Sequence, residues 1–295
     1  MKKMLFIYNP KSGKGMIRTH LAEIIDIFTK AEYFVTVHPT QCSGDAGTFA
    51  RDYGKNYDIV VASGGDGTLD EVVNGMMEAD SDVPIGYIPA GSTNDFGSSL
   101  SIPKDMLEAA KRIVKGTLFP CDIGGFNDKN FVYVAAFGMF TEVSYETDQN
   151  LKNTLGHMAY IVEAAKKVWN IPSLHMKVES ADFSVEGNFT YGMVSNAKSV
   201  GGIKGLTGGN VELDDGLLEV TLVSTPKNPV ELSEIVSALF LGGAESHLVK
   251  RFQTERVLFT CENPVAWTLD GERGGEYVSA DIFNKRRRLN FISFN

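Results

Sequence analysis

The chain has 295 residues, of which 43% are hydrophobic and 22% are charged, as in ordinary soluble globular proteins with room for two domains. Its formal net charge of -9 argues against nonspecific binding of nucleic acid. The apolar runs fall short of the ~20 residues that a membrane span needs, and the three cysteines lack disulfide or metal spacing. We therefore expect a cytoplasmic protein without a nucleic-acid partner.

The first part of the chain alternates apolar strands with amphipathic helices. Strands are expected at 4–8, 34–38, 57–62 and 84–88, and a helical pattern follows each of them. This alternation predicts a doubly wound parallel sheet, with helices on both faces, over residues 1–123. Such sheets bind ligands beyond the carboxyl ends of their strands.

Three polar loops that contain glycine follow the first, third and fourth of these strands. They are Asn9–Gly15, Gly64-Gly65-Asp66-Gly67-Thr68-Leu69 and Pro89–Gly97. Glycine lets a backbone approach a ligand closely, and a following helix N-terminus favours phosphate. Asp66 would repel phosphate unless a cation lies between them, so the three loops together predict a metal–nucleotide site. Taken alone, the Asp66 loop fits a tight turn equally well, and the loop with Lys14 fits a basic surface turn better.

From about residue 124 onward the pattern changes to short apolar runs separated by Gly, Asn, Asp and Pro. This pattern predicts an antiparallel β-sandwich over 124–295, with a barrel as the alternative. Helices are expected at 155–165 and 230–240. An alternative assignment places the extreme C-terminus in the first domain.

Two acidic turns and one basic run mark this second part. In the turn Glu212–Leu217, the Asp215 carboxylate and backbone carbonyl groups could bind a hard cation. In the turn after 265–269, Glu272 could act as a general base at the mouth of a crevice between domains. An Asp-Gly hairpin turn is the simpler interpretation of both. The basic run 285–288 is most simply solvated, with contact to anionic lipid as the alternative.

These motifs occur together, and as a set they resemble the bacterial diacylglycerol kinase family of soluble lipid kinases. The matching segments are Asn9–Lys14, Gly64–Leu69, Ile88–Phe96 and Asp270–Glu272, and the resemblance covers essentially the whole chain. Gly-Gly-Asp-Gly-Thr alone also resembles NAD kinases and phosphofructokinases, whereas the combination is specific for lipid kinases. The resemblance implies transfer of phosphate from ATP, with Mg²⁺, to the hydroxyl of diacylglycerol to give phosphatidic acid.

The resemblance also implies a role for individual residues of this chain. Lys14, Asp66 and Asp95 would belong to the catalytic network, with Asp66 near the catalytic Mg²⁺, and Glu272 would be the general base. The residues that would contact ATP are Asn9, Ser12, Gly13, Thr40, Gly64, Gly65, Asp66, Gly67, Thr68, Leu69, Glu71 and Ser92.

A second, structural Mg²⁺ would be held by Asp215 with the carbonyl groups of Glu212 and Leu217. Three positions depart from the family pattern, and one of them is Ser92, where close relatives often have threonine, which keeps the hydroxyl. Asp70 stands where many members have asparagine, which adds charge near the nucleotide. Ile203 replaces a glycine in a region that would face the lipid, which leaves the identity of the acceptor less defined.

Three other functions stay open at this point. The acceptor could be a sphingoid base, a monoacylglycerol or a polyprenol; the chain could be an NAD kinase; or it could be a non-catalytic sensor of nucleotide or lipid. Asp66, Asp95 and Glu272 together argue against a sensor, because binding alone needs no base. A lipid kinase would reach its substrate by transient peripheral contact with the membrane surface, and a homodimer is left open.

Overall fold

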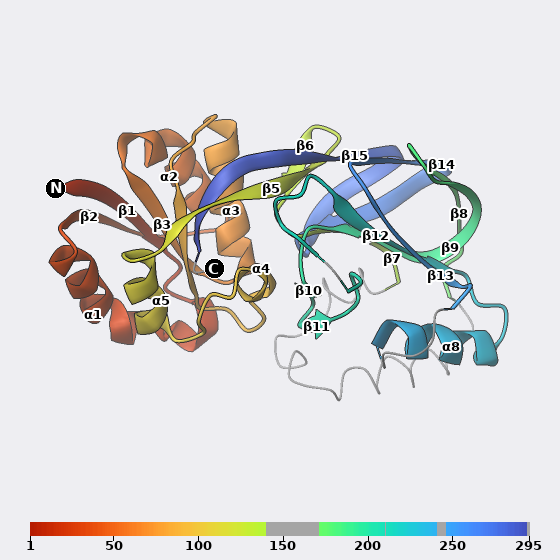
Figure 1. The fold of residues 1–295 in the computed structure, drawn as a ribbon, viewed down its shortest axis with the longest axis horizontal. Helices are drawn as coiled ribbons and strands as arrows, with labels where there is room; N and C mark the ends of the chain where they lie inside the picture. The colour runs from red at the N-terminus through yellow and green to blue at the C-terminus, as the bar shows by residue number, and fades with distance from the viewer. Residues whose placement is uncertain (140–170, 210, 241–245, 294–295) are drawn as a thin grey trace. The chain divides into compact units, whose positions relative to one another are not determined.

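The computed structural model describes residues 1–139, 171–209, 211–240 and 246–293. The chain divides into two compact units, which Figure 1 shows as ribbons. The first unit contains Met1–Ile123, Leu213–Gly216 and the chain from Lys285 onward, and the second contains the described parts of 124–212 and 217–284. The helix expected at 155–165 lies outside the described residues.

The first unit is built on a parallel sheet. Its strands lie in the order β2 (Tyr33–Pro39), β1 (Lys2–Tyr8), β3 (Ile59–Gly64) and β4 (Ile85–Pro89). The end of β15 (Glu272–Ser293) then runs parallel to β4, with Phe291 opposite Ile85. Strands β1, β3 and β4 are almost continuously apolar because helices cover both faces of the sheet.

Two pairs of helices cover the sheet, as expected from the alternating pattern. Helices α1 (Ile17–Lys30) and α5 (Met106–Ile113) pack together, and α2 (Asp45–Tyr53) and α3 (Asp66–Glu78) form the other pair (Figure 1). Three short helical turns complete the unit, and they are η1 (Ser12–Gly15), η2 (Gly54–Asn56) and α4 (Asp95–Ser99). The prediction of mixed α/β structure is confirmed.

The second unit is dominated by an antiparallel sheet. Its strands follow the order β13-β12-β9-β7-β14-β15, and β8 pairs with both β9 and β14. The bounds are β5 (Thr117–Phe126), β6 (Lys129–Phe131), β7 (Val134–Gly138), β8 (Leu174–Ser180), β9 (Ser184–Ser195), β12 (Leu218–Ser224), β13 (Val249–Thr254) and β14 (Arg256–Leu269). The hairpin β10 (Ser199–Val200) and β11 (Ile203–Lys204) and helix α8 (Pro229–Phe240) complete it.

Apart from the hairpin of β10 and β11, which pair only with each other, the described strands of this unit are hydrogen-bonded into one sheet, so the predicted sandwich is not confirmed in detail. Strand β14 joins two apolar runs that polar residues separate in the sequence, because a shift in its pairing with β15 between Thr260 and Val265 absorbs the interruption. Its first half pairs with β8 and its last residues pair with β7. The core of the unit centres on Trp267, whose ring centroid lies 4.8 Å from that of Phe137 and 5.1 Å from those of Phe126 and Phe259.

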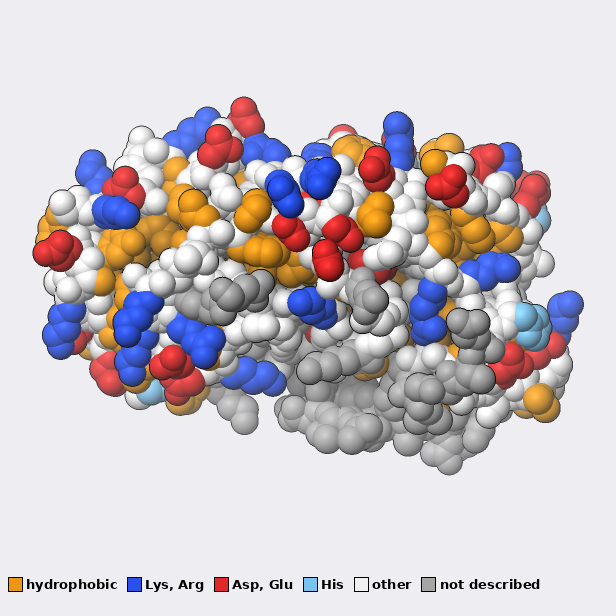
Figure 2. Space-filling model, viewed as in Figure 1, with side chains coloured by type: hydrophobic (Ala, Val, Ile, Leu, Met, Phe, Trp, Pro, Cys, Tyr) orange, Lys and Arg blue, Asp and Glu red, His pale blue; other side chains and the backbone are white. Residues whose placement is uncertain are grey.

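Charged side chains of both signs are interspersed over the face that Figure 2 shows, so the described part of this face carries no continuous basic stripe. Among the described residues, no helix combines the length and the apolarity that a membrane span requires. The three cysteines are free, and Cys42 is exposed whereas Cys121 is buried.

Candidate functional site

The loops predicted to carry the site leave the same edge of the first unit's sheet. Tyr8, the last residue of β1, lies opposite Pro39 of β2 and Ser63 of β3, and Gly64 lies opposite Pro89. Because the strands are parallel and end in register, the loops that follow them begin side by side. The expectation that the three glycine-containing loops share one edge is confirmed.

Two glycines allow these loops to pack backbone against backbone. Gly13 has a φ of +52°, and a Cβ there would lie 1.8 Å from the carbonyl oxygen of Ala90. A Cβ at Gly91 would lie 2.6 Å from the Cα of Gly65. Ser12 strengthens the contact because its Oγ accepts a hydrogen bond from the Gly65 N–H at 3.2 Å. The three loops therefore form one surface lined largely by backbone.

The N-terminus of α3 opens onto this surface. Gly65 occupies the N-cap position in an extended conformation, and no side chain caps the helix. The N–H groups of a first helical turn lack partners within the helix and carry the positive end of its dipole. Asn9 approaches the same turn, with its Nδ2 3.5 Å from the Thr68 Oγ1. The start of α3 therefore has the properties of a phosphate-binding helix terminus.

Asp66, in the first turn of α3, is the strongest electrostatic feature of the site. Burial raises the pKa of its carboxyl to about 6, and the charge of Asp95 adds to the increase. The backbone N–H groups of Asp95, Phe96 and Asn94 act in the opposite direction but do not outweigh burial. Its Oδ1 is buried without a hydrogen-bond partner. A buried carboxylate oxygen that lacks a donor and faces a second carboxylate is well suited to a hard cation.

Asp95 is 2% exposed at the start of α4, and Asn94 before it fixes the loop. The Asn94 Oδ1 accepts a hydrogen bond from the Gly91 N–H at 2.9 Å, and its Nδ2 donates to the Gly91 carbonyl at 2.7 Å. The Tyr87 hydroxyl lies 3.0 Å from the Gly64 carbonyl oxygen and 3.1 Å from the Asn94 Oδ1. Sequence reasoning assigned no role to Tyr87 or Asn94, although Asn94 lies inside a motif that matched the family.

Some residues predicted to contact ATP have other partners in the structure. Both carboxylate oxygens of Glu71 accept hydrogen bonds at the start of α2, from the N–H groups of Gly44 (2.8 Å) and Ala46 (3.1 Å). The Thr40 N–H donates to the Tyr8 carbonyl at 2.9 Å, which holds the loop after β2 at the same edge of the sheet. Ser92 is exposed. Lys14 lies on η1, and its side chain lies outside the described part of the structure.

The segment Leu213–Gly216, which contains Asp215, belongs to the first unit, where Asp122 holds it. Asp122 is fully buried, its N–H donates to the Leu213 carbonyl at 2.8 Å, and its Oδ2 accepts from the Gly216 N–H at 2.7 Å. The hairpin interpretation of Asp215-Gly216 is wrong, because the segment is an irregular link that ends before β12. Asp122 was missed, and its only signal was an acidic residue inside the apolar run 121–126.

The other two predicted ligands of this cation lie in the second unit. Glu212 is exposed, and the carbonyl oxygen of Leu217 accepts a hydrogen bond from the Asn284 Nδ2 at 3.0 Å. Within the described residues, no group of three or more His, Cys, Asp and Glu side chains is arranged to hold a metal ion. A cation at either predicted place would therefore depend on backbone carbonyls, phosphate oxygens or water for its remaining ligands.

The basic run 285–288 lies within β15, and two of its arginines form ion pairs at the surface. The Arg287 N–H donates to the Asp122 Oδ1 at 2.7 Å, and its guanidinium lies 3.1 Å from the Asp214 carboxylate. Arg288 forms ion pairs with Asp80 and Asp82. These ion pairs lie at the surface, and Arg286 and Arg287 are exposed, so the solvated interpretation fits this run.

The turn before Glu272 is a β-hairpin that joins β14 to β15, as its simpler interpretation predicted. Asp270 and Gly271 have φ values of +50° and +86°, and Leu269 pairs with Glu272. The Asp270 carboxylate accepts hydrogen bonds from three successive backbone N–H groups, Val132–Val134, so the turn is firmly anchored. The Glu272 side chain is exposed beside this anchored turn.

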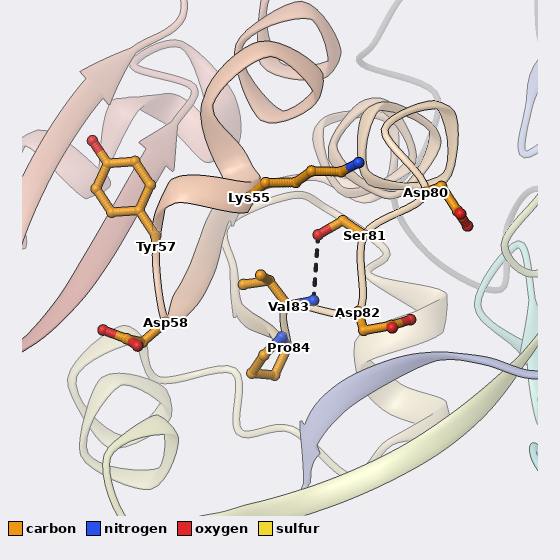
Figure 3. Close-up of a pocket in the computed structure, with 8 residues that line it drawn as sticks. All are labelled: Lys55, Tyr57, Asp58, Asp80, Ser81, Asp82, Val83 and Pro84. Carbon is orange, nitrogen blue, oxygen red and sulfur yellow. Dashed lines mark hydrogen bonds between the residues drawn. The ribbon is translucent and has the colours of Figure 1, made fainter.

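A surface pocket in the first unit lies away from these loops. Figure 3 shows that it is lined by residues from the links that precede β3 and β4, among them Lys55, Tyr57, Ser81 and Asp82. These links enter the sheet at the amino ends of its strands. The pocket is therefore at the edge opposite the glycine-containing loops.

Fold and site together define an α/β protein with a phosphate-compatible, cation-compatible edge on its parallel sheet. Residues 3–126 match the family model described as the diacylglycerol kinase catalytic domain. The chain is 32% identical over 296 residues to the diacylglycerol kinase of Bacillus subtilis strain 168, covering 99% of this chain and 96% of that protein. It is also 32% identical to the diacylglycerol kinase of Staphylococcus saprophyticus, covering 100% of this chain and 96% of that protein.

A solved structure from Bacillus anthracis strain Sterne, provisionally described as a diacylglycerol kinase, superposes with a TM-score of 0.85 and 26% identity. The match covers 99% of this chain and 95% of the other. The chain therefore belongs to the diacylglycerol kinase family, and the family predicted from its motifs is confirmed.

Proposed function

We propose that this protein transfers the terminal phosphoryl group of ATP to the free hydroxyl of diacylglycerol and so produces phosphatidic acid. Membership of the family supports the reaction. The observation that carries the proposal is the buried Asp66 carboxylate, whose Oδ1 lacks a hydrogen-bond partner, at an edge lined by glycine backbone. We assign the nucleotide to the first unit and the lipid to the antiparallel second unit.

The ATP phosphates would bind at the start of α3 and along the loops that carry Ser12, Gly13 and Ser92. Backbone N–H groups at this edge and the uncapped helix terminus support the assignment. Asp66, together with Asp95, would hold Mg²⁺, which would supply positive charge to the phosphate oxygens. Phosphoryl transfer depends mainly on positioning and charge neutralisation, so a rigid backbone cradle is the expected contribution of the protein.

Glu272 would act as the general base. The lipid hydroxyl oxygen forms a bond to the terminal phosphorus, its proton passes to the Glu272 carboxylate, and the bond from phosphorus to the ADP oxygen breaks. Proton removal of this kind is worth about 10²–10⁴-fold in rate. The exposed position of Glu272, beside a hairpin that Asp270 anchors through three backbone N–H groups, supports this role.

The remaining assignments are part of the same proposal. Lys14 would join the catalytic network, and Asp215, with the carbonyl groups of Glu212 and Leu217, would hold a second Mg²⁺. The hydrogen bonds from the Leu213–Gly216 segment to the buried Asp122 support a fixed conformation for Asp215. The lipid would be met at a membrane surface by transient contact from the cytoplasm.

The proposal is tested by transfer of label from γ-labelled ATP to a panel of acceptors. The panel contains diacylglycerol, monoacylglycerol, ceramide, sphingosine, undecaprenol and NAD, each with and without Mg²⁺. We expect label in phosphatidic acid, dependent on Mg²⁺. Label in NAD alone would overturn a lipid acceptor, and binding of ATP without transfer to any acceptor would favour a sensor.

The role of Glu272 is tested by Glu272→Gln, with Glu276→Gln as the matched control. Both side chains are exposed on β15, and Glu276 pairs with Arg273 at 3.1 Å. We expect the first variant to lose about 10²–10⁴-fold in kcat and the control to stay near the wild type. Both should melt like the wild type because neither side chain is buried. Wild-type turnover in Glu272→Gln would remove the base from the proposal.

A further inference from the structure

The proposed kinase site contains a hydrogen-bond link whose donor, Tyr87, lies outside the segments that match the family. We infer that Tyr87, acting through Asn94, is a positioning residue that fixes the loop of Asp66 relative to the loop of Asp95. The inference rests on the proposed function, because it concerns the geometry of the same two carboxylates. Tyr87 would not touch substrate; it would act on the backbone that carries the residues that do.

Tyr87 reaches both loops from the middle of β4. Its side chain is 1% exposed, and its hydroxyl lies 3.0 Å from the Gly64 carbonyl oxygen and 3.1 Å from the Asn94 Oδ1. Gly64 is the last residue of β3, two positions before Asp66, and Asn94 directly precedes Asp95. The single proton of this hydroxyl is shared between the two acceptor oxygens, and the hydroxyl therefore connects the two segments from which the carboxylates project.

Asn94 completes the link in the loop that follows β4. It is 5% exposed and has a φ of +54°, a conformation that asparagine tolerates better than most residues. Its amide closes a ring with Gly91 through hydrogen bonds of 2.9 and 2.7 Å. The Tyr87 hydroxyl thus bonds to a loop that is already rigid, and the constraint is transmitted to the start of α4.

The position of the Asn94–Asp95 segment matters for the proposed cation site. The backbone N–H groups of Asn94, Asp95 and Phe96 hydrogen-bond to the Asp66 carboxylate, so the conformation of this segment fixes the surroundings of Asp66. Burial, with the charges of Asp66 and Asp95, raises the pKa of the Tyr87 phenol well above its ordinary value. The phenol therefore stays a neutral hydrogen-bond donor at any working pH. A phenylalanine would keep the ring in place and remove the link.

The first experiment compares Tyr87→Phe with Ser81→Ala. The control removes a buried hydroxyl just before the amino end of β4, where the Ser81 Oγ accepts a hydrogen bond from the Val83 N–H at 3.3 Å (Figure 3). We expect Tyr87→Phe to lower kcat by about 10- to 100-fold with the KM for diacylglycerol unchanged, because small displacements at a reacting centre cost this much. We expect Ser81→Ala to keep wild-type kcat.

The second experiment needs no turnover. Mg²⁺ with ATP should raise the melting temperature of the wild type and of Ser81→Ala by the same amount, because both bind the ligand equally in the folded state. The rise should be clearly smaller in Tyr87→Phe. If Tyr87→Phe matches the control in both kcat and this melting shift, Tyr87 is a packing residue and the inference is wrong.

Asn94→Gly provides an independent test should Tyr87→Phe not fold. Glycine accepts the positive φ and deletes the amide, so the link to Tyr87 is lost together with the two hydrogen bonds to Gly91. Asn94→Gly should reproduce the loss of kcat. The kcat of the double variant Tyr87→Phe/Asn94→Gly should be no lower than that of the more impaired single variant, because both substitutions remove the same link. Additive losses would contradict a single link. A wild type that transfers no phosphate would instead refute the proposed function itself.

Discussion

Asp66 and Asp270 are both aspartates next to glycine in turns beside strands, yet their carboxylates are in opposite situations. Asp270 accepts hydrogen bonds from three backbone N–H groups between β6 and β7, one of them 2.5 Å and two of them 2.9 Å long. Asp66 also faces backbone N–H groups, at the start of α4, but its Oδ1 has no partner and its pKa is raised to about 6.

This difference separates a structural carboxylate from the one that we propose to be functional. Hydrogen bonds satisfy Asp270, so its charge stabilises the turn that it anchors. Burial and the charge of Asp95 destabilise the ionised form of the Asp66 carboxyl. A cation bound beside it would offset this destabilisation. The two aspartates can therefore be distinguished by whether each carboxylate oxygen has a hydrogen-bond donor.

The largest expected effect is the loss of activity in Asp66→Asn. We expect transfer to phosphatidic acid to fall by about 10²–10³-fold or more, because charge stabilisation of the transition state is lost. The melting temperature without Mg²⁺ should stay the same or rise, since the substitution removes repulsion from Asp95. If Asp66→Asn is active, or is inactive because it does not fold, the proposed contrast between Asp66 and Asp270 is wrong.

Asp270→Ala should behave in the opposite way, with its main effect on stability. Three buried N–H groups lose their acceptor, which should lower the free energy of unfolding by about 3 kcal/mol or more. Asp270→Asn keeps one acceptor oxygen and tolerates the φ of +50°, so it should lose clearly less. Unfolding in urea measures both, and equal stability of Asp270→Ala and the wild type would contradict the anchoring role.

The raised pKa of the Asp66 carboxyl should make the free energy of unfolding depend on pH. A carboxyl whose pKa is about 6 when folded and 3.8 when unfolded binds more protons in the folded state between these pH values. Stability relative to Asp66→Asn should therefore be greatest below pH 3.8 and fall by about 3 kcal/mol as the pH rises through 6. Unfolding without Mg²⁺ at several pH values tests this, and a difference that does not vary with pH would refute it.

Glu71 should show a smaller effect of the same kind as Asp270. Its carboxylate accepts hydrogen bonds from Gly44 and Ala46, so Glu71→Ala should lower the free energy of unfolding by about 1 kcal/mol. Glu78→Ala, on the exposed end of the same helix, is the control and should change little. A large rise in the KM for ATP without loss of stability would instead support the direct nucleotide contact that the family resemblance implied.

Much of the first unit followed from the sequence because its signals are local. The apolar strands and the amphipathic helices have distinct periodicities, and parallel strands bring their carboxyl ends to one edge. The second unit was less predictable because strand pairing is long-range: β14 continues across Glu262-Asn263-Pro264, which look like a turn in sequence. Both acidic turns suggested hairpins, and only the one at Asp270 is a hairpin.

The alternating α/β pattern could be predicted from the residues alone, as could the glycine-containing loops and the family, because these depend on neighbouring residues and on motif order. Which carboxylates have hydrogen-bond partners, in contrast, depends on contacts between distant parts of the chain. Asp122 bonds to Gly216 and Arg287, which are 94 and 165 residues away, and Tyr87 bonds to Gly64 across the sheet. Such partners leave no local pattern, since a hydrogen bond depends on distance in space and not on spacing along the chain.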